Sequence, residues 1–292
     1  MFMMRGIKKG FLFIAVFLTA GLHALDITVI GGVGNMSFDT ASENPLGSGE
    51  FKGNFYPLVR LTVSDQISDS IGCSATLERD PVLRNTLSCD MIIESGFLKL
   101  SVGPLFGLFS TWQTPVKPGI SAGICFEFPG IIFIDLKGGA SFGTIREKGD
   151  YTMELSRIAL GFWLPNLVNT ISITNHRFTM AKTSSLTTED ELFRVCNRID
   201  IYAKNIPYTI SIDMGYQSLK RSYDGTANGE DLIRAVFLGF ETAITIKPSF
   251  IFHLGAEVPV YIWGKEPLTR ADKHWCFQAF TGFTIVINKD PN

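Results

Sequence analysis

The residues best suited to act on a solute are charged side chains that alternate with apolar ones along strand-like segments. Two-residue spacing places such charges on one face of an extended chain, because successive side chains of a strand point in opposite directions. Charges of both signs on opposed walls create a transverse field in which polar solutes pass partly desolvated. The residues predicted to line such an interior are Arg60, Asp90, Lys99, Glu127, Asp135, Lys137, Arg194, Arg198, Asp200, Lys204, Asp213, Glu241, His253 and Glu257.

Arg194, Arg198 and Lys204 form the densest basic stretch of this set, with Asp200 between them. Their even spacing places them on one side of one strand, where they could favour anionic solutes. We expect neutral substitutions at Arg194 and Arg198 to shift ion selectivity toward cations. The competing interpretation is a salt-bridge network that fills an interior too narrow to conduct.

No arrangement typical of an enzyme accompanies these charges. His176, His253 and His274 are the candidates for activating a nucleophile, but no Ser/His/Asp spacing is recognisable around them. The glycines between Ile30 and Gly34 follow a strand-like run, yet the helix that a dinucleotide fingerprint requires is missing from the pattern. We therefore expect no catalysis and no cofactor.

The five cysteines are scattered over strand-like segments, which is not the clustered pattern of a disulfide-rich domain. Cys73 and Cys89 are equidistant from Pro81 and could face each other across a hairpin. The alternative is that they are small, buried apolar side chains. No CxxC or histidine-rich spacing indicates a metal site.

The first 24 residues have the organisation of a secretory signal peptide. A basic patch around Arg5 and Lys9 precedes an apolar run over residues 11–22. This run is shorter than the about 20 residues of a transmembrane helix. Cleavage is predicted after Ala24, so residues 1–24 form the signal peptide and residues 25–292 form one mature domain.

Composition narrows the class of that mature domain. The net charge of −2 argues against nucleic acid as a partner. Only 18% of the residues are charged, whereas soluble domains average about 25%. Yet no run of about 18 apolar residues, enough for a spanning helix, follows Ala24. An exported apolar chain without such helices can satisfy its backbone groups in a membrane by closing into a β-barrel.

Hydrophobic periodicity supports this fold class. Apolar residues occupy alternate positions over residues 67–77, 98–108, 132–141, 208–217 and 250–262, and Gly, Ser, Thr and charges fill the positions between. This alternation is typical of barrel strands with one face toward lipid and one toward the lumen. The alternation reverses around Thr152, Glu154 and Ser156, where we predict a β-bulge. Pro104 and Pro259 lie inside predicted strands and require bulges or strand ends.

The links between the segments alternate between long polar loops and short turns. Together they predict a closed antiparallel transmembrane β-barrel of about 14 strands, with about 12 as the second possibility. Loops are predicted near residues 39–54, 79–84, 110–118, 144–150, 181–191, 220–230 and 264–272, and turns at Asp65–Gln66, Ser95–Gly96, Pro129–Gly130, Pro165–Asn166, Ile206–Pro207 and Lys247–Pro248.

Aromatic residues gather near the predicted strand ends, as at Phe162 and Trp163, and the last segment alternates apolar residues up to Ile287. With these features, the mature chain resembles the small porin-like family of bacterial outer-membrane β-barrels. In that family the terminal strand is the signal read by the barrel insertion machinery. Here residues 288–292 follow that strand, a departure that makes the signal internal and is similar to spirochaete members.

The resemblance implies a porin-like channel in the cell outer membrane for passive diffusion of small solutes. The implied partners are outer-membrane lipid, the insertion machinery and the solutes. The alternative is a surface adhesin or receptor with a plugged lumen, because the loops predicted at 181–191 and 220–230 are polar and would face the medium. A channel gives discrete conductance steps, whereas an adhesin binds surface ligands without them.

Overall fold

The computed structural model describes residues 24–35, 55–111, 113–202, 206–225, 229–264 and 277–288. All regular elements among them are β-strands. The strands are β1 (Ala24–Gly34), β2 (Tyr56–Ser68), β3 (Ile71–Asp80), β4 (Arg84–Ser95), β5 (Leu98–Leu108), β6 (Val116–Phe128), β7 (Ile132–Ser141), β8 (Tyr151–Leu164), β9 (Leu167–Thr183), β10 (Leu186–Tyr202), β11 (Tyr208–Gly225), β12 (Gly229–Lys247), β13 (Phe250–Gly264) and β14 (Gln278–Asn288). Apart from Ala24, the predicted signal peptide lies outside the described residues. The predicted loop at 39–54 also lies outside them, as does the predicted loop at 264–272 apart from Gly264. Lys204 and His274 lie outside them too.

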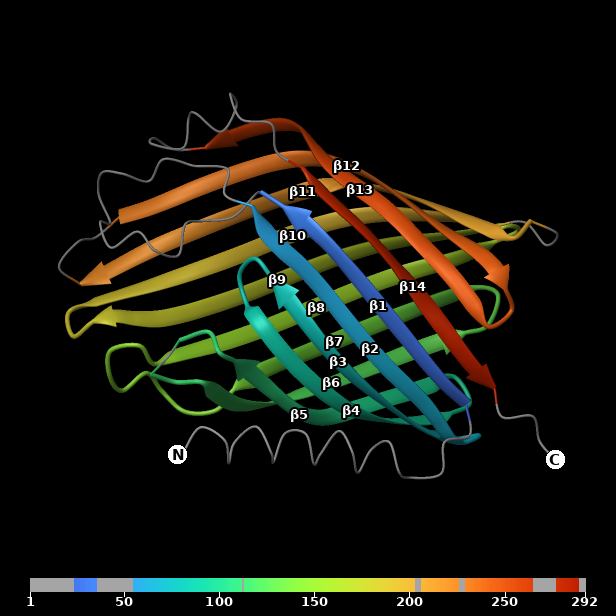
Figure 1. Cartoon of the computed structure of the whole chain (residues 1–292), viewed down its shortest axis with the longest axis horizontal. Helices are drawn as coiled ribbons and strands as arrows, with labels where there is room; N and C mark the ends of the chain where they lie inside the picture. Colours follow the sequence, from blue (N-terminus) through green and yellow to red (C-terminus); the bar gives the residue numbers. More distant parts are fainter. Residues whose placement is uncertain are drawn as a thin grey trace.

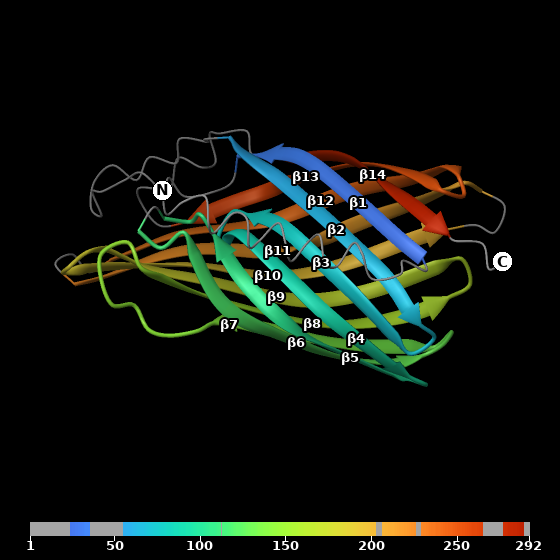
Figure 2. The ribbon, with the colours of Figure 1, turned by 60° about the horizontal axis from the view of Figure 1, so that its bottom comes forward.

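The fourteen strands form one closed antiparallel barrel (Figures 1 and 2). Each strand pairs with its neighbours in the sequence, and β1 closes the ring by pairing with β14. A closed ring leaves no edge strand with unpaired backbone groups. The prediction of an all-β closed barrel is confirmed, and the strand number is 14 rather than about 12.

The two rims of the barrel differ in their connections. At the rim where β1 begins and β14 ends, here called the turn rim, short turns join the strands; the opposite rim is called the loop rim (Figure 1). The predicted turns at Pro129–Gly130 and Pro165–Asn166 are confirmed, and φ is 75° at Gly130 and 63° at Asn166. Glycine and asparagine tolerate this conformation best. The turn predicted at Asp65–Gln66 is wrong, because β2 continues to Ser68 and the chain turns at residues 69–70.

The loops predicted at residues 181–191 and 220–230 are also wrong. Strands β9 and β10 are separated only by residues 184–185, and β11 and β12 only by residues 226–228. These segments are polar on both faces. The outward face carries Glu189 and Glu191. The inward face carries Asp190, which forms a buried ion pair with Arg221. As a result β9 to β12 have 17 to 19 residues, against 10 to 13 in β2 to β7.

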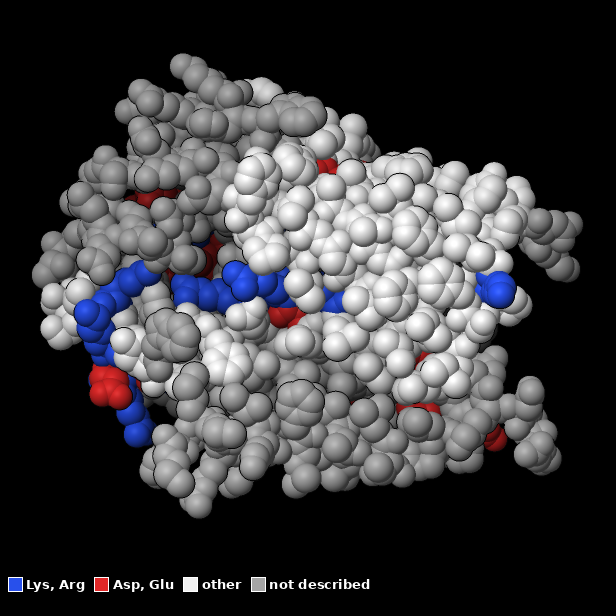
Figure 3. All heavy atoms as spheres, viewed as in Figure 1, with Lys and Arg blue, Asp and Glu red and all other residues white. Residues whose placement is uncertain are grey.

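Most of the barrel exterior is an apolar belt. Outward side chains such as Ile134, Ile158 and Leu238 are between 38% and 52% exposed. Uncharged side chains cover most of the described surface in Figure 3. Large aliphatic side chains exposed all around a barrel are unfavourable in water and suited to hydrocarbon.

Toward the loop rim, β8 to β12 have a different exterior. Their outward side chains are polar there, as at Thr152, Glu154, Arg177 and Glu191, and we call this part of β8 to β12 the outer section. Most of its inward side chains are apolar, with the buried ion pair of Asp190 and Arg221 among them. Tyr151, for example, is fully buried.

The bulge predicted around Thr152 and Ser156 is therefore wrong. Strand β8 pairs with β7 and β9 without any register shift. The alternation reverses because the surroundings reverse: Met153 is 1% exposed inside the barrel, while Glu154 faces outward. Pro259 does lie at a register shift between β12 and β13. At Pro104 the ladder between β4 and β5 is interrupted without a shift, since proline has no N–H to donate.

The register between β3 and β4 also decides the question of Cys73 and Cys89. Ala75, not Cys73, lies opposite Cys89. The intervening turn is centred one residue beyond Pro81, at Val82, so the equidistance in sequence does not translate into pairing. Both cysteines are free thiols.

Candidate functional site

The interior of the barrel holds contacts between strands that are not neighbours in the ring. Lys137 of β7 donates to Asp90 of β4 over 2.9 Å. Arg194 of β10 donates through two nitrogens to Glu257 of β13. Strands three apart in a closed ring can meet only across its interior, so these contacts identify the inward face of each strand.

Thirteen of the fourteen predicted lining residues lie within the described part of the chain, and Lys204 does not. All thirteen have inward positions; twelve of them contact a group of opposite charge, and His253 lies beside the carboxylate of Glu241. The contacts are Arg60–Glu78, Lys99–Glu127 (3.2 Å), Lys137–Asp90 (2.9 Å), Arg157–Asp135 (3.8 Å), Arg194–Glu257, Arg198–Asp200 (2.8 Å), Arg198–Asp213 (3.5 Å), Arg198–Glu241 (2.8 Å) and His253–Glu241 (3.5 Å). Their lining of a conduit stays a prediction.

Arg198 is the centre of the most highly charged group. Its guanidinium contacts the carboxylates of Asp200, Asp213 and Glu241 and also donates to the Ser211 hydroxyl over 2.7 Å. That hydroxyl in turn donates to Asp200 over 2.6 Å. Three carboxylates around one cation give this group a net negative charge.

Arg194 lies on the same strand as Arg198, four residues nearer the loop rim. Its guanidinium forms a two-pronged pair with Glu257 and stacks on the ring of Phe237, 3.9 Å from the ring centre. Arg194, Arg198 and Glu257 line a cavity of about 350 Å³ inside the barrel, with Arg60 on the opposite side. Two-pronged pairing fixes the plane of the guanidinium, so the cavity wall here is well defined.

A second charged wall is formed by β4 to β7. Asp90 accepts from both Lys137 and the buried hydroxyl of Ser121. Nearer the turn rim, Lys99 lies between Glu127 at 3.2 Å and Glu94 at 3.7 Å. Each cation on this wall thus has at least one carboxylate beside it.

Near the loop rim an apolar cluster fills part of the interior. The turn between β3 and β4, here called the inward turn (residues 81–83), inserts Val82 and Leu83 with only 1% and 3% of their surface exposed. The other fully buried members come from β5, β8, β9, β11 and β12: Leu105, Tyr151, Met153, Phe178, Met180, Leu219, Ile233 and Ala235. The cluster therefore spans the interior from one wall to the other.

Asp80 holds the inward turn in this position. One of its carboxylate oxygens accepts from the backbone N–H groups of Val82 and Leu83, each over 2.7 Å, and the other lies 3.1 Å from Nδ1 of His176 on β9. Arg84 follows the turn with a positive φ of 65° and stacks on Phe178, 4.3 Å from the ring centre. A positive φ at arginine is uncommon, and these contacts maintain it.

His176 and Asp80 lie beyond the apolar belt, and each alters the pKa of the other. Burial by itself lowers the pKa of His176, but the charge and hydrogen bond of Asp80 outweigh burial and raise that pKa. Burial likewise favours a raised pKa for Asp80, yet His176 and the two backbone N–H groups lower it. The pair is therefore ionised over a wider pH range than either group alone.

Glycines on the inward face of the strands provide space for aromatic rings and do not only enlarge the interior. The ring of Phe280 on β14 packs against Gly255 of β13, where an added Cβ atom would lie only 2.3 Å from a ring atom. Phe133 covers Gly161 in the same manner. Small residues on the inward face thus accommodate aromatic rings from neighbouring strands.

Sequence reasoning missed Glu78 and Asp80 as interior residues. Asp80 fell within a predicted loop, although it shares even spacing with Ser74, Thr76 and Glu78, all on the inward face of β3. Phe237 and Phe280 were not identified as inward residues either, although Phe237 shares its spacing with Gly239 and Glu241. Following one alternation to the end of each strand would have identified all four.

The candidate histidines are engaged in local contacts. His176 pairs with Asp80, and His253 contacts the Thr284 hydroxyl over 3.0 Å. Within the described ranges, no group of three or more His, Cys, Asp or Glu residues is placed to hold a metal ion. The same ranges contain no helix with the length and hydropathy to cross a membrane.

No protein-family model and no curated protein sequence matches this chain. Solved structures of outer-membrane proteins are similar to it in fold. An outer-membrane channel of Pseudomonas putida F1 has 8% identity and a TM-score of 0.48, covering 91% of this chain and 96% of that one. OmpT of Vibrio cholerae has 7% identity and a TM-score of 0.46, covering 91% and 97%. OmpF of Salmonella typhi, solved with daunomycin, has 11% identity and a TM-score of 0.42, covering 91% and 97%. At these values the likeness says nothing about solutes or activity.

Proposed function

We propose that this chain is an outer-membrane channel through which small polar solutes diffuse passively. The observation that carries the proposal is a set of paired charges around an interior cavity, within a closed barrel whose belt is apolar. Hydrocarbon outside and water inside is the arrangement that makes both surfaces favourable. Outer-membrane lipid and the barrel insertion machinery are the partners this location requires.

The pairing of the charges favours neutral or zwitterionic solutes. Arg194 and Arg198 are paired with four carboxylates, those of Asp200, Asp213, Glu241 and Glu257. The anion preference expected from the basic stretch therefore does not follow from the structure. A weak preference for cations is expected instead.

Conductance of the full mature chain, refolded and placed in planar bilayers, tests the proposal. We expect discrete steps, and a double Arg194→Gln, Arg198→Gln variant should shift the reversal potential further toward cations, because four carboxylates lose their partners. Arg234→Gln, at an outward position of β12, is the matched control and should leave the reversal potential unchanged. Absence of steps from correctly folded protein, shown by heat-modifiable gel mobility, would contradict the proposal.

The apolar cluster favours a second candidate, a surface receptor with a plugged lumen. Val82 and Leu83 close part of the interior and leave the exposed outer section as a surface for ligands. The two candidates differ in one result. A channel gives discrete conductance steps with the inward turn in place, whereas a receptor plugged by this turn is silent until the turn is removed.

We propose no catalytic role for either candidate. A lipid-cleaving centre needs a nucleophile activated by a histidine. His176 contacts Asp80 across the interior, and His253 contacts Thr284 of the neighbouring strand; both contacts are of a kind that supports the structure. Lipid hydrolysis by the refolded protein, compared with a His176→Ala, His253→Ala variant, tests this statement.

A further inference from the structure

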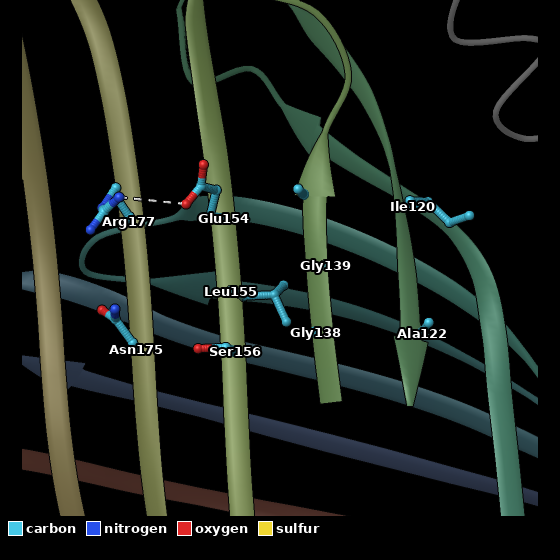
Figure 4. A pocket seen from close by; sticks show the side chains of 10 residues that line it. Ile120, Ala122, Gly138, Gly139, Glu154, Leu155, Ser156, Asn175 and Arg177 are labelled. Carbon is cyan, nitrogen blue, oxygen red and sulfur yellow. Dashed lines mark ion pairs between the residues drawn. The ribbon is translucent and has the colours of Figure 1, made fainter. Parts of the chain in front are cut away.

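A groove of about 430 Å³ lies on the outside of the barrel, over β6 to β9 and separate from the interior cavity (Figure 4). Two neighbouring rungs of paired residues form it. One rung consists of Ala122, Gly138, Ser156 and Asn175, and the next toward the loop rim consists of Ile120, Ala140, Glu154 and Arg177. The groove thus changes from apolar on β6 to polar on β9.

Side-chain size explains the hollow. The adjacent rung toward the turn rim consists of large apolar residues, Ile124, Leu136, Ile158 and Ile173. At the next rung, Ala122 and Gly138 fill far less space. A Cβ atom added at Gly138 would have only the carbonyl oxygen of Leu155 nearby, at 3.8 Å. The hollow lies where the apolar belt meets the outer section, the level at which lipid head groups begin.

Two polar atoms of this groove lack hydrogen bonds and have opposite requirements. Oδ1 of Asn175 is a buried acceptor without a donor. Nε of Arg177 is a buried donor without an acceptor within hydrogen-bond geometry, and the nearest carboxylate oxygen, of Glu189, is 3.5 Å away. Buried polar groups in native proteins are nearly always satisfied. Both atoms are covered by protein, so a ligand that offers one donor and one acceptor would satisfy them once the side chains of Asn175 and Arg177 turn toward the groove.

The charged residues around the groove further restrict which chemical class of ligand can bind there. Arg177 contacts three carboxylates, those of Glu154, Glu189 and Glu191, at 3.5 to 3.7 Å. These ion pairs are long, so the guanidinium retains the capacity to contact another anion. The excess of carboxylates favours a ligand with a positive group and disfavours one that is only negative.

We propose that the groove binds one phospholipid whose head group carries a primary ammonium next to the phosphate. The ammonium donates to Oδ1 of Asn175, the phosphate accepts from Arg177, and the upper acyl segment lies over Ala122 and Gly138. The inference rests on the proposed membrane location but not on conduction. A barrel that conducts nothing can still bind this lipid.

Native mass spectrometry of the full mature chain in detergent micelles tests the inference. The probes are phosphatidylethanolamine, phosphatidylcholine and phosphatidylglycerol with identical acyl chains. We expect one phosphatidylethanolamine to bind at least about tenfold more tightly than phosphatidylcholine, because a quaternary ammonium has no N–H to donate. Phosphatidylglycerol, which lacks the cation, should bind as weakly as phosphatidylcholine.

Variants locate the site. Gly138→Leu fills the hollow and should reduce phosphatidylethanolamine binding to the level of phosphatidylcholine. Gly31→Leu is the matched control, since a Cβ atom at Gly31 also meets nothing within 4 Å but lies on β1. Asn175→Leu should abolish the preference between the two lipids, and Asn175→Asp, which keeps an acceptor, should retain it. Heat-modifiable mobility shows that each variant is folded.

Equal affinity of the folded wild-type protein for phosphatidylethanolamine and phosphatidylcholine would overturn the proposal, and this result needs no variant. An equal loss of binding in Gly31→Leu and Gly138→Leu would also overturn it, because the lipid would then be bound without a site. A lipid-free dimer in detergent that Gly138→Leu dissociates would assign the groove to a second copy of the chain instead. Failure of the proposed channel would show as missing conductance and would leave these results unaffected.

Discussion

Polar and apolar side chains alternate along the whole of β9, but the apolar ones face outward in the belt and inward in the outer section. In the belt, Ile171 and Ile173 face outward and are 45% and 42% exposed. In the outer section, Arg177 faces outward while Phe178 and Met180 are buried inside. The strand is continuous, so the difference arises from the surroundings. Apolar side chains face hydrocarbon where it lies outside, and face the interior where water lies outside.

The two regions therefore use the hydrophobic effect in different ways. In the proposed membrane location, lipid covers the apolar face of the belt, which leaves the interior free for charges. In the outer section the apolar faces of β8 to β12 need cover from the protein itself, and Val82 and Leu83 of the inward turn supply part of it. The polar exterior at the loop rim and the apolar filling of the interior at the same level therefore have one cause.

The largest effect on stability is expected when a charged residue replaces an apolar one on the inward face of the outer section. Met153→Glu places an unpaired carboxylate within the apolar cluster and should lower the free energy of unfolding by about 3–5 kcal/mol. Glu154→Met, at the adjacent outward position, should change it by less than about 1 kcal/mol. Urea unfolding of both variants in identical micelles measures the difference. Equal effects would show that the outer section is not inverted.

A lysine substitution should distinguish the two regions along the exterior of one strand. Leu160→Lys places a charge between Ile158 and Phe162 in the belt and should destabilise the barrel by about 2–4 kcal/mol in a bilayer. Thr152→Lys, with the same outward orientation in the outer section, should cost about 0–1 kcal/mol. Folded fractions in vesicles over a denaturant series provide the comparison. A similar cost at both sites would place Thr152 within the hydrocarbon.

The inward turn offers a test of the interior. Leu83→Ala removes a side chain that is 3% exposed and should lower the free energy of unfolding by about 2–3 kcal/mol, the lower part of the usual range because a rim can relax. It should also raise the single-channel conductance by opening the apolar cluster. Ile131→Ala, at a position 68% exposed in a turn on the other rim, is the control and should alter neither quantity. An unchanged conductance in the Leu83 variant would favour the plugged receptor.

The smallest effect is expected from pH. The raised pKa of His176 means that its stabilising contribution is complete below the ordinary value of 6.5 and is lost as pH rises through the higher folded value. The lowered pKa of Asp80 means that its contribution is complete above 3.8 and is lost as pH falls through the lower folded value. Between these limits the pair retains the inward turn. Conductance should therefore rise modestly from about pH 6 to about pH 9, and His176→Gln, which cannot titrate, should remove this dependence.

Much of the fold could be predicted because its signals are local. Two-residue alternation and turn residues such as Gly130 and Asn166 depend only on neighbouring positions, and they led to a closed barrel of 14 strands. The turn near Asp65 and the loops at 181–191 and 220–230 were misplaced for a common reason. Polar residues were taken as signs of loops, although a strand with water on its outer face and a buried ion pair such as Asp190–Arg221 on its inner face is polar on both.

The sequence by itself determined the strand pattern and the set of residues that share one face, because side-chain direction in a strand is fixed by position. Only the tertiary structure decided that Arg198 is surrounded by three carboxylates and that Asp80 reaches His176. These contacts join strands far apart in the sequence, and their geometry depends on how the ring closes. The orientation of the outer section was decided in the same way, because it depends on which solvent lies beyond the wall.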